Sequence, residues 1–131
     1  MHRRTFLLSA AALIPSAAFS YPAETFSPAI WRDLGAGTQT IVLNYRASWS
    51  LTCQIKAELI ADALVANPEY NRLVFVDVDW DTFGRSQLTE RLKVNRRSTL
   101  LVMKNGTEVA RLENQPYERE VRALLDTALA A

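Results

Sequence analysis

An apolar, β-branched run that passes almost directly into a helical pattern constrains this chain more than any other feature. The run covers Thr40–Tyr45 and predicts a buried strand. From about residue 51 to residue 65, apolar residues recur at three- and four-residue spacing, which predicts a helix ended by Asn67-Pro68. The expected inward face of this helix consists of Ile55, Leu59, Ile60, Ala63 and Leu64. A second apolar run, Leu73–Asp79, predicts a parallel strand reached by a right-handed crossover.

The rest of the chain supplies the other elements of a single α/β domain. Tyr21–Ser27 is interpreted as a polar lead-in to a helix that starts at Ser27-Pro28. Further helices are expected over residues 81–94 and 117–130, and strands over residues 99–104 and 107–112. Asn105-Gly106 between these two strands is typical of a tight type I′ hairpin turn. The order of elements predicts a central mixed β-sheet flanked by helices.

Composition and charge exclude several classes of partner. The 131 residues are 49% hydrophobic and 22% charged, which fits one globular domain with a core. Beyond residue 20, 13 basic residues face 14 acidic ones, a near balance that gives no electrostatic reason to bind nucleic acid or an anionic membrane surface.

The first twenty residues have the pattern of a secretory signal peptide. His2-Arg3-Arg4 forms a basic start, an apolar run follows, and small residues flank the expected cleavage point before Tyr21. Arg3-Arg4 followed by Thr5-Phe6-Leu7 also resembles the twin-arginine export signal. We therefore expect a signal peptide over residues 1–20, a mature domain over residues 21–131 and a periplasmic location, with no membrane attachment after cleavage. An uncleaved N-terminal anchor is the alternative.

Cys53 is the only cysteine in the sequence, and it lies at the expected start of a helix. The segment Trp49-Ser50-Leu51-Thr52-Cys53 resembles the Trp-Cys-x-x-Cys turn of the thioredoxin-like family, with serine in place of the first cysteine. Thr99-Leu100-Leu101-Val102-Met103-Lys104-Asn105-Gly106 resembles the family's Pro-Thr-Leu-Leu-x-Phe-Lys-Asn-Gly hairpin. The resemblance extends from about residue 27 to the C-terminus. It implies a thioredoxin-like fold, a thiol-disulfide oxidoreductase ancestry and no cofactor.

The resemblance also assigns site residues and shows where the chain departs from the family. Ser50 stands at the nucleophile and Cys53 at the second cysteine, which normally releases the mixed disulfide. Ser98 stands where the family has a cis-proline, and a cis bond before serine would cost roughly 2.5–4 kcal/mol, so a trans bond is expected. Asn44 stands where many thioredoxins bury an aspartate near the second thiol, and an amide cannot take its proton. The expected substrate groove consists of Trp49, Leu51, Thr52, Arg97, Ser98 and Thr99.

Rival chemistries find little support in the residues. The only histidine is His2, so a Ser-His-Asp mechanism at Ser50 lacks a base in the mature chain, and no His- or Cys-rich metal site is expected. Asp77, Asp79 and Asp81 alternate as though they faced one way, but polar residues at a strand end explain them better than a cation site. Arg96-Arg97 could hold an anion or an acidic partner segment, with a solvated loop as the alternative.

Three functional hypotheses remain open. The chain could keep single-thiol chemistry at Cys53, with a thiol- or disulfide-bearing protein or peptide as substrate and a periplasmic reductase as partner. It could instead be a redox-inactive module that binds polypeptide in the thioredoxin groove. Ser50 could also be a deliberate substitution that disarms an active oxidoreductase. We expect burial to outweigh the helix N-terminus at Cys53 and to make its thiol sluggish.

Overall fold

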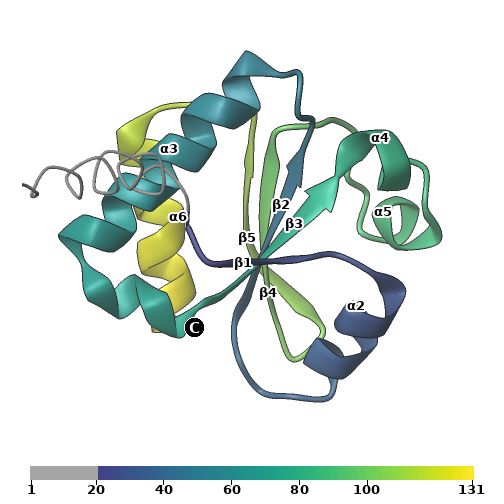
Figure 1. Cartoon of the computed structure of the whole chain (residues 1–131). Coiled ribbons are helices and arrows are strands. Elements are labelled where there is room, and N and C mark those ends of the chain that lie inside the picture. Colours follow the sequence, from purple (N-terminus) through teal and green to yellow (C-terminus); the bar gives the residue numbers. More distant parts are fainter. Residues whose placement is uncertain (1–20) are drawn as a thin grey trace, which may run out of the picture.

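The computed structural model describes residues 21–131 as a five-stranded sheet with helices on both faces (Figure 1). The signal peptide expected over residues 1–20 lies outside the described residues. The elements, in chain order, are β1 (Ala23–Thr25), α2 (Pro28–Gly35), β2 (Ile41–Arg46), α3 (Leu51–Ala66), the short 3₁₀ helix η2 (Pro68–Arg72), β3 (Val74–Asp79), α4 (Trp80–Phe83), α5 (Gln87–Arg91), β4 (Thr99–Lys104), β5 (Thr107–Glu113) and α6 (Glu118–Ala130). Within residues 21–131, no helix has the length and apolar character needed to cross a bilayer.

The sheet is mixed, with strand order β1-β3-β2-β4-β5. β1, β3 and β2 are parallel, and α3 makes the crossover between β2 and β3. β4 runs antiparallel to both β2 and β5. Asn105 and Gly106 join β4 to β5 with φ angles of 52° and 77°, the positive values that the sequence predicts for this turn. The expected α/β class with a central mixed sheet is confirmed.

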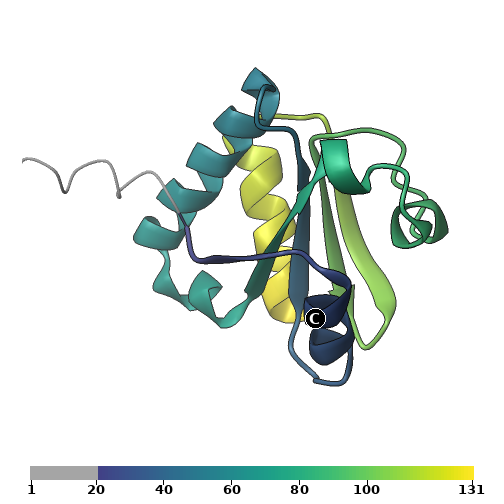
Figure 2. The same ribbon diagram turned by 45° about the vertical axis from the view of Figure 1, so that its right-hand side comes forward.

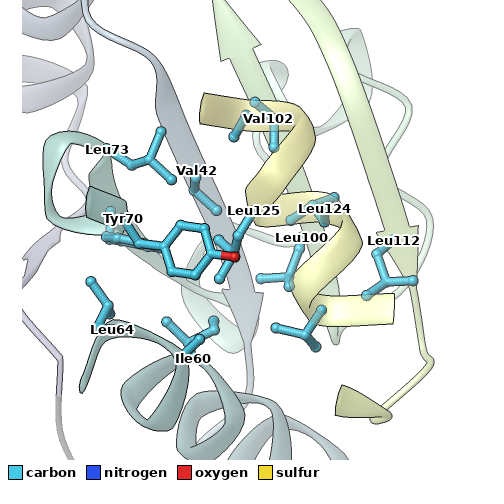
Figure 3. Packing of buried hydrophobic residues seen from close by; sticks show 14 residues of the cluster. Val42, Ile60, Leu64, Tyr70, Leu73, Leu100, Val102, Leu112, Leu124 and Leu125 are labelled. Carbon is cyan, nitrogen blue, oxygen red and sulfur yellow. The ribbon is translucent and has the colours of Figure 1, made fainter. Parts of the chain in front are cut away.

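Alternation along the central strands sends side chains to two separate cores. On one face, Val42, Leu100 and Val102 pack under α3 and α6, together with Leu124 and Leu125 of α6 (Figure 3). On the other face, the intervening residues Leu43, Leu101 and Met103 pack under α2, α4 and α5. Figure 2 shows the two groups of helices on opposite sides of the sheet. Because both faces are covered, β2 is buried along almost its whole length.

Two local predictions are wrong. The lead-in contains β1, which pairs with β3 from Ala23↔Phe75 to Thr25↔Asp77, a long-range contact that its polar sequence does not reveal. The helix expected over 81–94 is two short helices, α4 and α5. Gly84 closes α4 so tightly that an added Cβ would lie 2.6 Å from the Trp80 carbonyl oxygen, and Ser86 starts α5 by accepting a hydrogen bond from the Thr89 N–H.

Candidate functional site

The turn between β2 and α3 is built around Ser50. Its backbone is extended, and its hydroxyl accepts a hydrogen bond from the Cys53 N–H at 3.3 Å, so Ser50 is the N-cap of α3. Its side chain is buried, with 4% of the residue exposed. The residue at the expected nucleophile position therefore has a structural partner inside the protein and is turned away from solvent.

Cys53 lies one turn inside α3 and is 1% exposed. Its Sγ accepts a hydrogen bond from the Ala47 N–H at 3.4 Å, and the thiol forms no disulfide. A thiol in this position cannot meet a protein disulfide unless the loops around it move, because attack requires the sulfur to reach its target directly.

The loop before β4 is fixed by Ser98. Ser98 has a positive φ of 61°, and all peptide bonds within residues 21–131 are trans, as expected before serine. Its N–H donates to the Tyr45 carbonyl at 2.7 Å, and its carbonyl accepts from the Asn114 N–H at 2.9 Å. The Ser98 hydroxyl is buried without a hydrogen-bond partner among the described residues. Thr99 is also buried, and its hydroxyl donates to the Arg96 carbonyl at 2.8 Å.

Lys56 is a buried lysine that sequence reasoning missed. It is 0% exposed, one turn after Cys53, and its Nζ donates to the Ser98 carbonyl at 2.5 Å. Burial lowers the pKa of Lys56 from its usual 10.5 to about 8; the neighbouring Cys53 opposes this shift and Arg96 adds to it. Lys56 thus ties α3 to the loop that carries Arg97 and Ser98.

The prediction for the inward face of α3 is confirmed for Ile60, Ala63 and Leu64, and Leu59 packs partly buried against the same core, but it is wrong for Ile55. Ile55 is on its exposed side, whereas the buried positions are Cys53, Lys56, Ala57, Ile60, Ala61, Ala63 and Leu64. These positions follow helical spacing, so Lys56 falls on the stripe defined by Cys53 and Ile60. Helical spacing from Cys53 and Ile60 points to burial of position 56, but a prediction based on apolar residue types does not include a lysine.

An exposed patch at the turn that precedes the buried thiol consists of Trp49, Leu51 and Arg97. Trp49 is 60% exposed and Leu51 is 69% exposed, while Thr52 beside them is half-buried. The Trp49 indole N–H donates to the Asp81 carboxylate, at 2.9 Å to Oδ2. The guanidinium carbon of Arg97 lies 4.6 Å from the centre of the Trp49 ring, a cation–π contact. Of the six residues predicted for the groove, the structure brings Trp49 and Arg97 into contact, and Leu51 is exposed two residues after Trp49.

Asn44 takes part in a polar network with Tyr21, another residue that the sequence did not single out. Asn44 is buried and shares the α3 side of the sheet with Val42; its amide donates to the Tyr21 hydroxyl at 2.7 Å. Tyr21 in turn donates to Asp77 at 2.6 Å, and Arg46 pairs with the same carboxylate at 3.3 Å. Burial, followed by the charge of Asp77, raises the pKa of Tyr21. The amide that replaces the family's aspartate thus has a structural partner in Tyr21.

Asp77, Asp79 and Asp81 each bind a different partner. Asp77 binds Tyr21 and Arg46, Asp79 caps α4 through the Thr82 N–H at 3.1 Å, and Asp81 holds the Trp49 indole. Each carboxylate thus has its own protein partner, in agreement with their interpretation as polar residues at a strand end.

Comparison with known proteins identifies the fold. No protein-family model matches the sequence, and no curated protein matches it. Among solved structures, the chain is similar to Trxlp from Edwardsiella tarda, with 24% identity, a TM-score of 0.67, and coverage of 80% of this chain and 96% of that one. It is similar to the thioredoxin NaTrxh from Nicotiana alata, with 22% identity, a TM-score of 0.67, and coverage of 83% and 96%. The oxidised thioredoxin of Plasmodium falciparum gives 21% identity, a TM-score of 0.66, and coverage of 80% and 96%. The predicted thioredoxin-like fold is confirmed.

Proposed function

We propose that this chain is an exported thioredoxin-like protein that binds an extended polypeptide at the Trp49–Leu51–Arg97 patch and has lost dithiol exchange. One observation carries the proposal: the sole cysteine is 1% exposed, whereas Trp49 and Leu51, which precede it in the same turn, are 60% and 69% exposed. A partner that binds this turn would therefore contact exposed apolar side chains, whereas the Cys53 sulfur is buried.

The chemistry of Ser50 supports the loss of exchange. A serine hydroxyl cannot form a disulfide, and Cys53 alone has no second thiol in the chain to release a trapped mixed disulfide. The hydroxyl instead caps α3, a role that needs only an oxygen acceptor. What remains of the thioredoxin turn is its shape and its exposed tryptophan, both suited to contact with a polypeptide.

A binding measurement tests this proposal. The purified chain is screened against immobilised short peptides of varied sequence, together with Trp49→Ala and, as a matched control, Val65→Ala, which removes another exposed apolar side chain of the same turn-and-helix unit. We expect peptide binding that Trp49→Ala abolishes and Val65→Ala preserves. Absence of any bound peptide, or equal binding by the Trp49→Ala variant, would contradict the proposal.

Restoring the missing thiol addresses the possibility of a disarmed oxidoreductase. Ser50→Cys recreates a Cys-x-x-Cys pair at the start of α3, so this variant, with dithiothreitol as the electron donor that regenerates its dithiol, should reduce a protein disulfide at a measurable rate above the dithiothreitol background while the unmodified chain does not. Activity should stay below that of a standard thioredoxin, because Ser98 and Asn44 remain. Robust turnover by the unmodified chain would refute the loss of exchange.

The proposed location is the periplasm, reached by the signal peptide over residues 1–20 and, we propose, by the twin-arginine route. The support is the sequence pattern of Arg3-Arg4 and the apolar run after it. Changing both arginines to lysine should leave precursor in the cytoplasm, and the mature protein should begin at Tyr21. Full-length protein retained in washed membranes would instead favour an uncleaved anchor.

A further inference from the structure

We propose that the polypeptide bound at the Trp49–Leu51–Arg97 patch is acidic, and that Arg97, supported by Arg96, selects it through its carboxylate side chains. This inference rests on the proposed function and adds the chemical class of the partner. The observation behind it is that the exposed Arg97 lies against the exposed Trp49 ring, and that Arg96, the preceding residue in the chain, is exposed as well. The ion pairs found within residues 21–131 join Arg46, Arg111 and Arg122 to acidic residues, and neither Arg96 nor Arg97 takes part in one.

The contact between Arg97 and Trp49 leaves the hydrogen-bonding edge of Arg97 available. The guanidinium carbon lies 4.6 Å from the centre of the Trp49 ring, and the five N–H donors of a guanidinium group lie in its plane and point away from its central carbon. A carboxylate can then be bound in the plane through two parallel N–H···O bonds. The contact also restricts Arg97, so less conformational entropy is lost when a carboxylate binds.

Asp81, the acidic residue that contacts this patch, pairs with Trp49 and, within the described residues, forms no ion pair with Arg96 or Arg97. Both oxygens of Asp81 accept from the Trp49 indole N–H, at 3.2 and 2.9 Å. That contact fixes the indole plane and uses its only donor, so Trp49 presents an apolar ring to a partner. A bound segment that fits the patch therefore has an apolar residue for Trp49 and Leu51, and a carboxylate close by for Arg97.

The loop that carries the arginines is held in place from behind. The Ser98 carbonyl accepts from both Lys56 Nζ and the Asn114 N–H, and the Ser98 N–H donates to Tyr45. These bonds join α3, β2 and the segment after β5 to the residue next to Arg97. Because the Ser98 backbone groups already have partners inside the protein, a bound segment is selected by side chains: Trp49 and Leu51 for its apolar residue, and Arg97 with Arg96 for its carboxylates.

Matched peptides provide the test. Three short peptides share the same apolar residues and carry several glutamates, glutamines or lysines, and their affinities are measured by fluorescence anisotropy with the full chain at low ionic strength. We expect the glutamate peptide to bind about five- to tenfold more tightly than the glutamine peptide, and the lysine peptide more weakly than either. The advantage should shrink at high salt, because these charges are exposed.

Variants assign the selection to Arg97. Arg97→Gln should remove most of the preference for glutamate while leaving the affinity for the glutamine peptide nearly unchanged, and Arg97→Lys should keep part of the preference. Arg119→Gln, an exposed arginine of α6, is the control and should change nothing. Equal affinity for the glutamate and glutamine peptides would overturn the inference but leave the proposed function standing. Displacement of the glutamate peptide by inorganic phosphate at equal concentration would also overturn it, in favour of a simple anion site. Failure of all three peptides to bind would instead overturn the proposed function.

Discussion

A fully buried lysine beside the sole thiol is the least ordinary residue of this protein. Lys56 reaches no solvent and donates to the Ser98 carbonyl, so its charge is held where charge is costly. A depression of its pKa from 10.5 to about 8 corresponds to on the order of 3 kcal/mol of destabilisation when the amine is protonated. Lys56 is thus retained at an energetic cost while it fixes the loop beside the patch.

The cost of Lys56 predicts an unusual pH dependence. Below about pH 8 both the folded and the unfolded chain hold this proton, so the full penalty applies. Between about pH 8 and 10.5 the folded chain releases the proton first, the unfolded chain binds more protons, and the contribution of Lys56 to stability rises with pH.

Lys56→Met should therefore raise the free energy of unfolding by ~1–3 kcal/mol at pH 7, and the gap to the unmodified chain should close towards pH 10. Urea unfolding of both chains at a series of pH values measures this difference in the free energy of unfolding. Lys104→Met, whose amine donates to the Ala131 carbonyl at the surface, is the control. A Lys56→Met variant less stable than the unmodified chain at pH 7 would show that the lysine is stabilising.

Tyr21 gives a second prediction for a single side chain. Its hydroxyl donates to Asp77 and accepts from the buried amide of Asn44, so Tyr21→Phe leaves both groups without this partner. We expect a loss of ~1–3 kcal/mol in urea unfolding, because an unsatisfied buried polar group is costly. Tyr117→Phe changes a 62% exposed tyrosine and should leave stability within ~0.5 kcal/mol. A neutral Tyr21→Phe would show that the network adds nothing to stability.

At the scale of elements, the break between α4 and α5 depends on Gly84. A Cβ at this position would lie 2.6 Å from the Trp80 carbonyl oxygen, a backbone atom that cannot turn aside. Gly84→Ala should therefore cost ~1–3 kcal/mol in thermal or urea unfolding. The matched change Gly35→Ala, at the end of α2, meets no atom within 4 Å and should leave stability unchanged or slightly raised. Equal effects of the two changes would contradict this explanation.

The elements also show which parts of the fold can be predicted from sequence. Long segments with strong periodicity, such as α3, α6 and the β4–β5 hairpin, are found correctly, because local pattern and tertiary burial agree there. β1 is missed because three residues gain their strand conformation from a distant partner, β3. Lys56 is missed because the pattern was assigned by residue type, whereas burial follows position on the helix. The Trp49–Cys53 segment predicts the site turn, but the pairing of Trp49 with Asp81 and Arg97 depends on α4 and on the loop before β4, both distant in the sequence.

At the scale of the whole molecule, the sheet topology explains why the segments that carry Trp49, Asp81 and Arg97 meet. β2 and β3 are parallel, so the segments that follow them, with Trp49 and Asp81, lie at the same edge of the sheet. β4 is antiparallel to β2, so the segment before it, with Arg97, lies at that edge too. The fold thus brings the turn before α3, the start of α4 and the loop before β4 to one edge of the sheet, where Ser50 caps α3.

Alkylation of Cys53 in the native chain tests the central claim, a shielded thiol next to an exposed binding surface, most directly. Cys53 is the only cysteine, so the mass added by iodoacetamide reports this residue alone. Rates are measured from pH 5 to 9 for the folded chain and for the chain unfolded in urea. We predict labelling of the folded chain to be at least about tenfold slower than that of the unfolded chain throughout, because a loop must open before the reagent can reach the sulfur. Labelling of the folded chain below pH 7 at the rate of the unfolded chain would contradict the account and favour single-thiol catalysis at Cys53.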